Sequence, residues 1–232
     1  MSEVEAVPLD LLDRRTVRVR ARNVAIAAVI VAAAFGGIVS LFAGPVGFVT
    51  TLVIVAVPLL LLAWTESRKT ITLRGHEVVA RALGSRVVDV HKATRLDLFV
   101  TDLRGARTIN VLIGGAPKGK AISVSLAMYA GTGGRELGVY ALRRLADALA
   151  GNEDTRGLVL SQLVIAQLRA EARGEAPPNR PLYQLASLAP QGRMAQRLQP
   201  EAVSKFVAVE RHRRLGADAL RPAGAGVPAV RR

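Results

Sequence analysis

The 232-residue chain contains no cysteine, which excludes disulfides, thiolate zinc sites, iron–sulfur clusters and a cysteine nucleophile. Aromatic residues are also scarce, at 4% of the chain, and none is interleaved with the basic cluster Arg211, Arg213 and Arg214. Surfaces that bind single-stranded nucleic acid usually combine basic and aromatic side chains. Nucleic acid is therefore not expected as a partner.

Charge is absent from residues 24–65, where the sequence has no Asp, Glu, Lys or Arg. Two apolar runs, 24–43 and 46–64, occupy this stretch and are separated by a Gly-Pro pair. A helix of about 20 apolar residues crosses the roughly 30 Å hydrocarbon core of a bilayer. The runs therefore predict a two-helix transmembrane hairpin over residues 23–65.

Basic residues flank this hairpin, with Arg18, Arg20 and Arg22 before it and Arg68 and Lys69 after it. Because Lys and Arg are retained on the cytoplasmic side, both chain ends are expected in the cytoplasm. A cleaved signal peptide is the alternative, but its apolar core would be only about 7–15 residues long. A second apolar run follows here at once, which favours two membrane spans.

Small residues gather on one side of the first run: Ala32, Ala33, Gly36, Gly37 and Ser40. Such spacing lets helices approach closely in lipid. The face would pack either against a partner membrane protein or against the second run of the same chain. Since neither run carries an ionisable residue, this chain alone is not expected to form an ion or proton path.

After the hairpin the pattern changes from continuous apolar runs to alternation of apolar and polar residues. Period-two segments with glycine punctuation predict short antiparallel strands. A strongly amphipathic segment, 135–150, predicts a closing helix. The fold class is therefore an α+β membrane protein. The six predicted strands are 69–73, 77–83, 86–91, 95–101, 107–113 and 121–128.

A hairpin followed by these strands (69–128) and one helix (135–150) resembles the bacterial PH-like-domain membrane proteins. The resemblance covers residues 66–150 and the hairpin before them. It implies an antiparallel β sandwich or barrel capped by a C-terminal helix, with seven strands where the sequence shows six. It also implies a binding or scaffolding role without catalysis. The expected location is the bacterial plasma (inner) membrane.

Around these two units the chain divides into three further segments. Residues 1–22 form a cytoplasmic N-terminal segment that ends in basic residues. Residues 151–192 are expected to hold an extra helix and a Pro-rich linker. Residues 193–232, with nine basic and three acidic residues, read as a basic and partly disordered tail.

One segment partly matches the phosphate-binding P-loop motif of nucleotide-binding proteins. Residues 114–120 (GGAPKGK) fit G-x4-G-K, but Ala121 stands where a P-loop needs a hydroxyl, and the residues after it alternate like a strand. A nucleotide-dependent enzyme using this loop is the least favoured hypothesis. The three histidines, His76, His91 and His212, lack ligand spacing, so no metal is predicted. No cofactor and no catalytic residues are predicted.

The favoured hypothesis is a non-enzymatic scaffold or accessory subunit of a larger membrane assembly. Its expected partners are membrane lipids and either other membrane protein subunits or further copies of itself. The alternative is a module that binds or senses anionic lipid, because the net charge is +14. The predicted lipid contacts are Arg18, Arg20, Arg22, Arg68, Lys69, Lys118 and Lys120.

Overall fold

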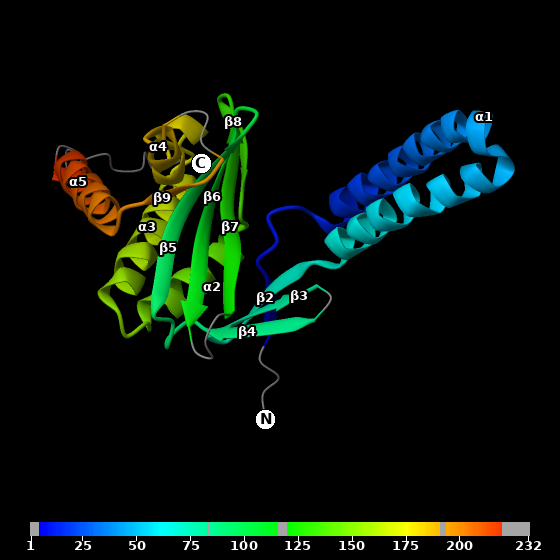
Figure 1. Cartoon of the computed structure of the whole chain (residues 1–232). Coiled ribbons are helices and arrows are strands. Elements are labelled where there is room, and N and C mark those ends of the chain that lie inside the picture. The colour runs from blue at the N-terminus through cyan, green and yellow to red at the C-terminus, as the bar shows by residue number, and fades with distance from the viewer. Residues whose placement is uncertain (1–4, 83, 116–119, 191–193, 220–232) are drawn as a thin grey trace, which may run out of the picture.

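The structure is a computed structural model that describes residues 5–82, 84–115, 120–190 and 194–219. Its first long element is the helix α1 (Arg14–Arg68), whose two arms fold back on each other at Gly44. Figure 1 shows the arms side by side, projecting away from the β-sheets. Gly44 has φ 63°, a left-handed conformation that glycine adopts without strain, and Pro45 then begins the second arm.

The helical element differs from the prediction in its extent. It begins at Arg14, ten residues before the first apolar run, and ends at Arg68, while the non-helical backbone of Gly44 divides it into two helical arms at the predicted Gly-Pro pair. By length and composition, the described part of the chain contains one helical stretch that could cross a membrane, Arg15–Thr65. Only 11% of its most apolar window is buried, so most of this apolar surface faces outward.

Alanines mediate the contact between the two arms. Ala28, Ala32, Ala56 and Ala63 are all buried although their larger neighbours are exposed. Close approach continues to Gly36, where an added Cβ would lie 3.0 Å from the ring of Phe48 on the other arm. The second arm therefore packs against part of the small-residue face of the first.

A four-stranded antiparallel sheet lies at the base of the hairpin. The segment before α1 supplies its first strand, although the sequence predicted no strand there. The backbone N–H of Leu9 extends the pairing by donating to the carbonyl of Ile71 at 2.8 Å, and Asp10 Oδ1 accepts from the N–H of Ile71 at 3.0 Å. The spatial order is β1 (Ala6–Pro8), β2 (Thr70–Arg74), β3 (Glu77–Arg81) and β4 (Ser85–Asp89).

A five-stranded antiparallel sheet forms the second layer. Its buried faces follow the predicted alternation, with Ile109, Val111 and Ile113 fully buried on β6. In the turn between β5 and β6, Arg104 and Gly105 both have positive φ, and Asp102 accepts from the Gly105 N–H. The order is β8 (Gly133–Glu136), β7 (Lys120–Ala130), β6 (Ala106–Gly115), β5 (Arg95–Leu103) and β9 (Gln196–Leu198).

Seven strands, β2–β8, lie between the hairpin and the closing helix, where the sequence predicted six. The additional strand, β8, begins in the glycine-rich segment between the predicted strand 121–128 and the predicted helix 135–150. Glycine is needed there because a Cβ at Gly134 would lie 2.3 Å from the Tyr129 ring. The closing helix α2 (Val139–Ala150) therefore begins four residues later than Arg135, and it buries Leu142, Leu145 and Leu149 in the core.

The C-terminal third packs on the same core. Helix α3 (Thr155–Ala172) lies against α2 and buries Leu160, Leu163 and Val164. The expected linker contains a short 3₁₀ helix, η1 (Pro177–Asn179), followed by α4 (Pro181–Ser187). Helix α5 (Pro200–Ala219), within the segment predicted to be a basic and partly disordered tail, then contacts α3. Figure 1 shows α3, α4 and α5 on the side of the five-stranded sheet away from α1.

We predict that Leu9→Ala destabilises the full chain, because Leu9 is 1% exposed and fastens the segment before α1 to the core. Truncating a buried leucine costs about 2–5 kcal/mol. Thermal unfolding of the detergent-purified protein should therefore begin several degrees lower. The matched control is Leu188→Ala, at a residue that is 65% exposed, which should change stability by about 0.5 kcal/mol or less. Equal midpoints for both variants would contradict this role of Leu9.

Candidate functional site

A crevice of about 750 Å³ lies where the base of the hairpin meets the β-sheets. One wall comes from both arms of α1, including Val17, Val24 and Leu62. The opposite wall comes from β6 and β7, through Thr108 and Met128, which are paired across these strands. The lining is mainly apolar, and we refer to this space as the juxtamembrane crevice.

Of the basic residues predicted to contact lipid, Arg18 and Lys69 line the juxtamembrane crevice. Arg22 lines a shallow apolar groove between the arms, together with Trp64. The Arg68 guanidinium lies 4.1 Å from the centroid of the Trp64 ring, a cation–π distance. The structure therefore gathers four predicted residues around the base of the hairpin; Arg20 belongs to the same arm.

Two of the predicted lipid contacts come from the segment between β6 and β7. Lys118 lies outside the described residues, and Lys120 begins β7, where it pairs with Gly115. Thr108, in the crevice, and Gly115 are separated by about 23 Å along β6, at about 3.3 Å per residue. Gly115 and Lys120 therefore lie at the end of the sheet away from the crevice. Because Lys120 begins a strand, no helix N-terminus starts there to bind a nucleotide phosphate.

The small residues predicted for transmembrane packing divide into two groups. Ala32 and Gly36 are buried between the arms. Ala33 and Gly37 are half-buried, and an added Cβ at Gly37 would meet nothing within 4 Å. Ser40 donates to the carbonyl of Gly37 at 2.7 Å, within its own helix. The chain's second arm therefore covers one part of this face and leaves Gly37 open.

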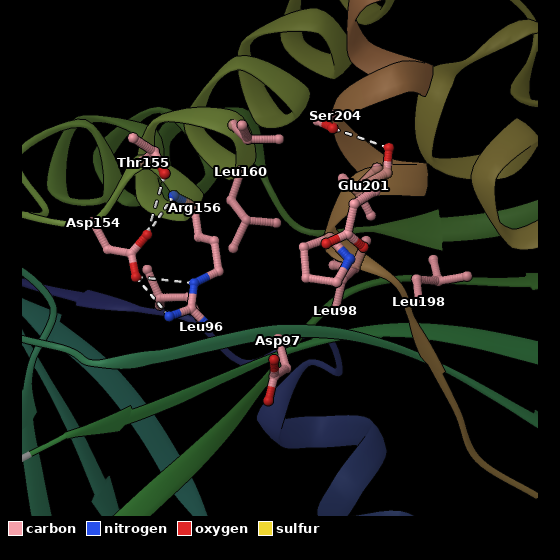
Figure 2. A pocket seen from close by; sticks show the side chains of 13 residues that line it. Leu96, Asp97, Leu98, Asp154, Thr155, Arg156, Leu160, Leu198, Glu201 and Ser204 are labelled. Carbon is pink, nitrogen blue, oxygen red and sulfur yellow. Dashed lines mark hydrogen bonds and ion pairs between the residues drawn. The ribbon is translucent and has the colours of Figure 1, made fainter.

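A second pocket, of about 460 Å³, lies between β5, the start of α3 and α5. In Figure 2, Asp154 and Arg156 point toward each other on its α3 side, with Arg156 Nη2 2.6 Å from Asp154 Oδ2. Asp154 also caps α3 by accepting the Arg156 backbone N–H at 2.9 Å. The hydrogen bonds from Arg156 lower the pKa of Asp154 below its ordinary value. This carboxylate therefore serves as a helix cap and ion-pair partner and is poorly suited to accept a proton.

Asp97, labelled in Figure 2, is the most deeply buried carboxylate of this pocket. Its side chain is fully buried, and its two oxygens accept from Arg95 at 2.9 Å and Arg197 at 2.5 Å. Arg197 comes from β9, so the ion pair fastens the C-terminal strand to β5. A buried charge with two partners on its oxygens is satisfied, which fits a structural role.

Another buried polar cluster holds the C-terminal third in place. The Tyr129 hydroxyl donates to Glu136 at 2.6 Å, and Arg180 donates to the other oxygen of Glu136 at 2.5 Å. Burial, followed by the hydrogen bond to Glu136, raises the pKa of Tyr129 well above its ordinary value. Tyr129 is therefore a neutral hydrogen-bond donor that ties β7 to β8, while Arg180 ties β8 to the start of α4.

Two histidines that appeared unrelated in the sequence lie together. The rings of His76 and His91 are stacked with centroids 4.8 Å apart, and His76 Nε2 lies 3.8 Å from Asp89 Oδ2. The two histidines lie just beyond the paired ends of β3 and β4, where Glu77 pairs with Asp89, and this register brings their rings together. Among the described residues no cluster of three or more His, Asp or Glu side chains suits a metal ion.

The site residues that sequence reasoning missed are those that strands far from the hairpin in sequence contribute to the juxtamembrane crevice. Thr108, Ser125 and Met128 line the juxtamembrane crevice from the outward face of the sheet, and nothing in their local pattern relates them to the hairpin. No protein-family model, curated protein or solved structure matches the chain.

We predict a pH-dependent contribution of Asp154 to stability. Its folded pKa lies below the ordinary value of 3.8, so its charge-dependent stabilisation is complete above that pH and is lost as the pH falls through the folded pKa. Asp154→Ala should cost about 1 kcal/mol at pH 7. Asp154→Asn keeps a capping oxygen and should cost less. Thermal unfolding in detergent should show that the wild-type advantage over Asp154→Asn shrinks at pH 3.

Glu153→Gln provides the matched control, because Glu153 is exposed, adjacent to Asp154 and not the cap of α3. It should leave the midpoint nearly unchanged at both pH values. A wild-type advantage over Asp154→Asn that stayed the same from pH 7 to pH 3 would contradict the charged cap.

Proposed function

We propose that this chain is a membrane protein whose hairpin crosses the bilayer twice and whose cytoplasmic PH-like domain acts as a scaffold or accessory subunit of a larger membrane assembly. The observation that carries the proposal is the pairing of β1 with β2, which fastens the domain to both ends of the hairpin. A domain held in this way keeps one orientation relative to the hairpin. A fixed orientation suits a scaffold that must present its surfaces to neighbouring subunits.

The surface of the hairpin supports the membrane assignment. Its outward side chains are large and apolar, with Phe35, Leu41 and Phe42 more than half exposed. A contiguous apolar surface of this kind is stable in lipid and unfavourable in water. The exposed residues Arg68 and Trp64 at the base match the arrangement of side chains that anchor a helix at the cytoplasmic interface.

The domain supports a non-catalytic role. In the pocket shown in Figure 2, Asp154 and Arg156 form an ion pair with each other. Asp97 forms ion pairs with Arg95 and Arg197. Seven strands followed by one helix also agree with the number expected of a PH-like barrel. The second candidate function, binding of anionic lipid, is favoured by the basic residues gathered around the juxtamembrane crevice.

The topology is tested by labelling single introduced cysteines; because the sequence has no native cysteine, only the introduced thiol can react. Pro45→Cys places a thiol at the turn of the hairpin, and Ser85→Cys places one on the exposed start of β4. In intact bacterial cells with a permeable outer layer, a membrane-impermeant maleimide should label only the Pro45→Cys variant. After lysis it should label both. Labelling of Ser85→Cys in intact cells would overturn the orientation, and equal protection of both would overturn the two-pass hairpin.

The assembly is tested by purification in mild detergent at native expression level. We expect the full chain to elute with a defined membrane protein or with further copies of itself. Gly37→Leu should reduce this retention about tenfold, because it adds bulk where the chain's own arms leave space. The control Ile38→Leu alters a neighbouring exposed position conservatively and should retain the complex. Elution of the wild-type chain as a lone monomer would contradict the proposed role.

A further inference from the structure

We propose that the juxtamembrane crevice binds one anionic phospholipid, with its phosphate at Arg18 and Lys69 and an acyl chain along the apolar wall of α1. The inference deepens the proposed function and rests on it, since the hairpin must lie in the bilayer for lipid to reach the crevice. It concerns a defined site for one molecule, and a general attraction to an anionic surface would not require such a site.

The volume and lining of the crevice fit this occupant. Its volume of about 750 Å³ lies within the range of about 300–1,000 Å³ that is common for ligand sites. The apolar part of the α1 wall comes from Val17, Ala21 and Val24 on the first arm and from Leu62 and Ala63 on the second. Acyl chains lie favourably on such a surface, whereas a soluble polar metabolite would leave it unsatisfied.

Continuity with the membrane-facing surface gives the lipid a route. Ala21 and Ala63 line both the juxtamembrane crevice and the shallow groove between the arms. That groove is lined further along the hairpin by Val57 and Leu61. An acyl chain can therefore pass from the bilayer to the crevice over a mainly apolar surface.

The charged residues favour an anion. Those that line the crevice among the described residues are Asp10, Arg18 and Lys69, which leaves a net charge of +1. Asp10 accepts the backbone N–H of Ile71 at 3.0 Å and so contributes to the attachment of the hairpin. Arg18 is exposed and forms no ion pair with any residue that the structure describes.

The depth of Arg18 matches that of a headgroup. It precedes the first apolar run by six residues, or about 9 Å of helix. The interfacial layer on each side of a bilayer is about 5–8 Å thick, and a long arginine side chain can extend back toward it. The hydroxyls of Thr70 and Thr108 lie on the domain side of the same space and add hydrogen-bonding capacity near a phosphate.

The test uses the full chain in detergent micelles supplied with equal amounts of phosphatidylglycerol and phosphatidylcholine that have the same acyl chains. Native mass spectrometry then counts the lipids that remain bound. Wild type should retain one phosphatidylglycerol in preference to phosphatidylcholine. Arg18→Gln should reduce that preference about fivefold, the effect of about 1 kcal/mol for one basic side chain near an anionic surface.

Matched control variants distinguish loss of the lipid site from a general loss of surface charge and from misfolding. Arg135→Gln removes the same charge from exposed β8 and should leave the preference unchanged. Thr108→Phe fills the crevice from β6 and should abolish retention of both lipids. Ser123→Phe adds the same ring at an exposed position of β7 and should not. Arg18→Lys, which keeps the charge, should retain most of the preference.

Three results would overturn the inference: equal retention of the two lipids by wild type, retention by Thr108→Phe equal to that by Ser123→Phe, or displacement of the lipid by glycerol 3-phosphate. The last result would indicate a site for a soluble phosphate ester. If maleimide labelling supports the two-pass hairpin while these results fail, only the lipid site falls. If the labelling fails, the proposed function falls as well.

Discussion

The hydrogen bonds between β1 and β2 are the constraint on which the arrangement of this molecule depends. These strands stand immediately before and after the 55-residue helix α1, so their pairing closes the hairpin at its base. Val7 and Leu9 enter the core from this segment at 2% and 1% exposure. Burial of a side chain of this size contributes about 1.5–3 kcal/mol. The hairpin is therefore anchored through the hydrophobic core of the domain and does not hang from a flexible linker.

The same core extends to the other end of the chain. Leu182 and Leu185 of α4 belong to the cluster of buried residues that includes Val7 and Leu9. Polar contacts reinforce the docking, since Gln167 accepts the backbone N–H of Leu182 and Asp97 holds Arg197 of β9. The segment before the hairpin and the C-terminal helices therefore share one close-packed core, and such cores deform little.

Some of this fold could be predicted because its signals are local. The charge-free stretch and the Gly44-Pro45 turn indicate the hairpin directly, and alternation identifies β5, β6 and β7. The strands β1 and β9 have three residues each and carry no period of their own. Their pairing is decided by residues about 60 and 100 positions away in the sequence. The strand β8 was missed because glycine is unusual in strands. Here the close approach of the Tyr129 ring requires glycine at Gly134, and that contact is not visible in the local sequence.

The candidate sites likewise combine features that are visible locally in the sequence with features that depend on contacts between distant residues. Basic residues next to an apolar run are visible in the sequence, so Arg18, Arg22, Arg68 and Lys69 could be predicted as a group. The crevice that two of them line could not be predicted, because its second wall consists of Thr108, Ser125 and Met128 on strands that follow the hairpin by more than 40 residues. The attachment of the hairpin sets the spacing between these walls. Scaffolding and lipid binding are therefore not independent alternatives, because the contacts that fix the domain on the hairpin also form the crevice where Arg18 and Lys69 meet an apolar wall. A lipid in that space would contact both units at once and stabilise the orientation in which they are held, since a ligand favours the arrangement that it binds.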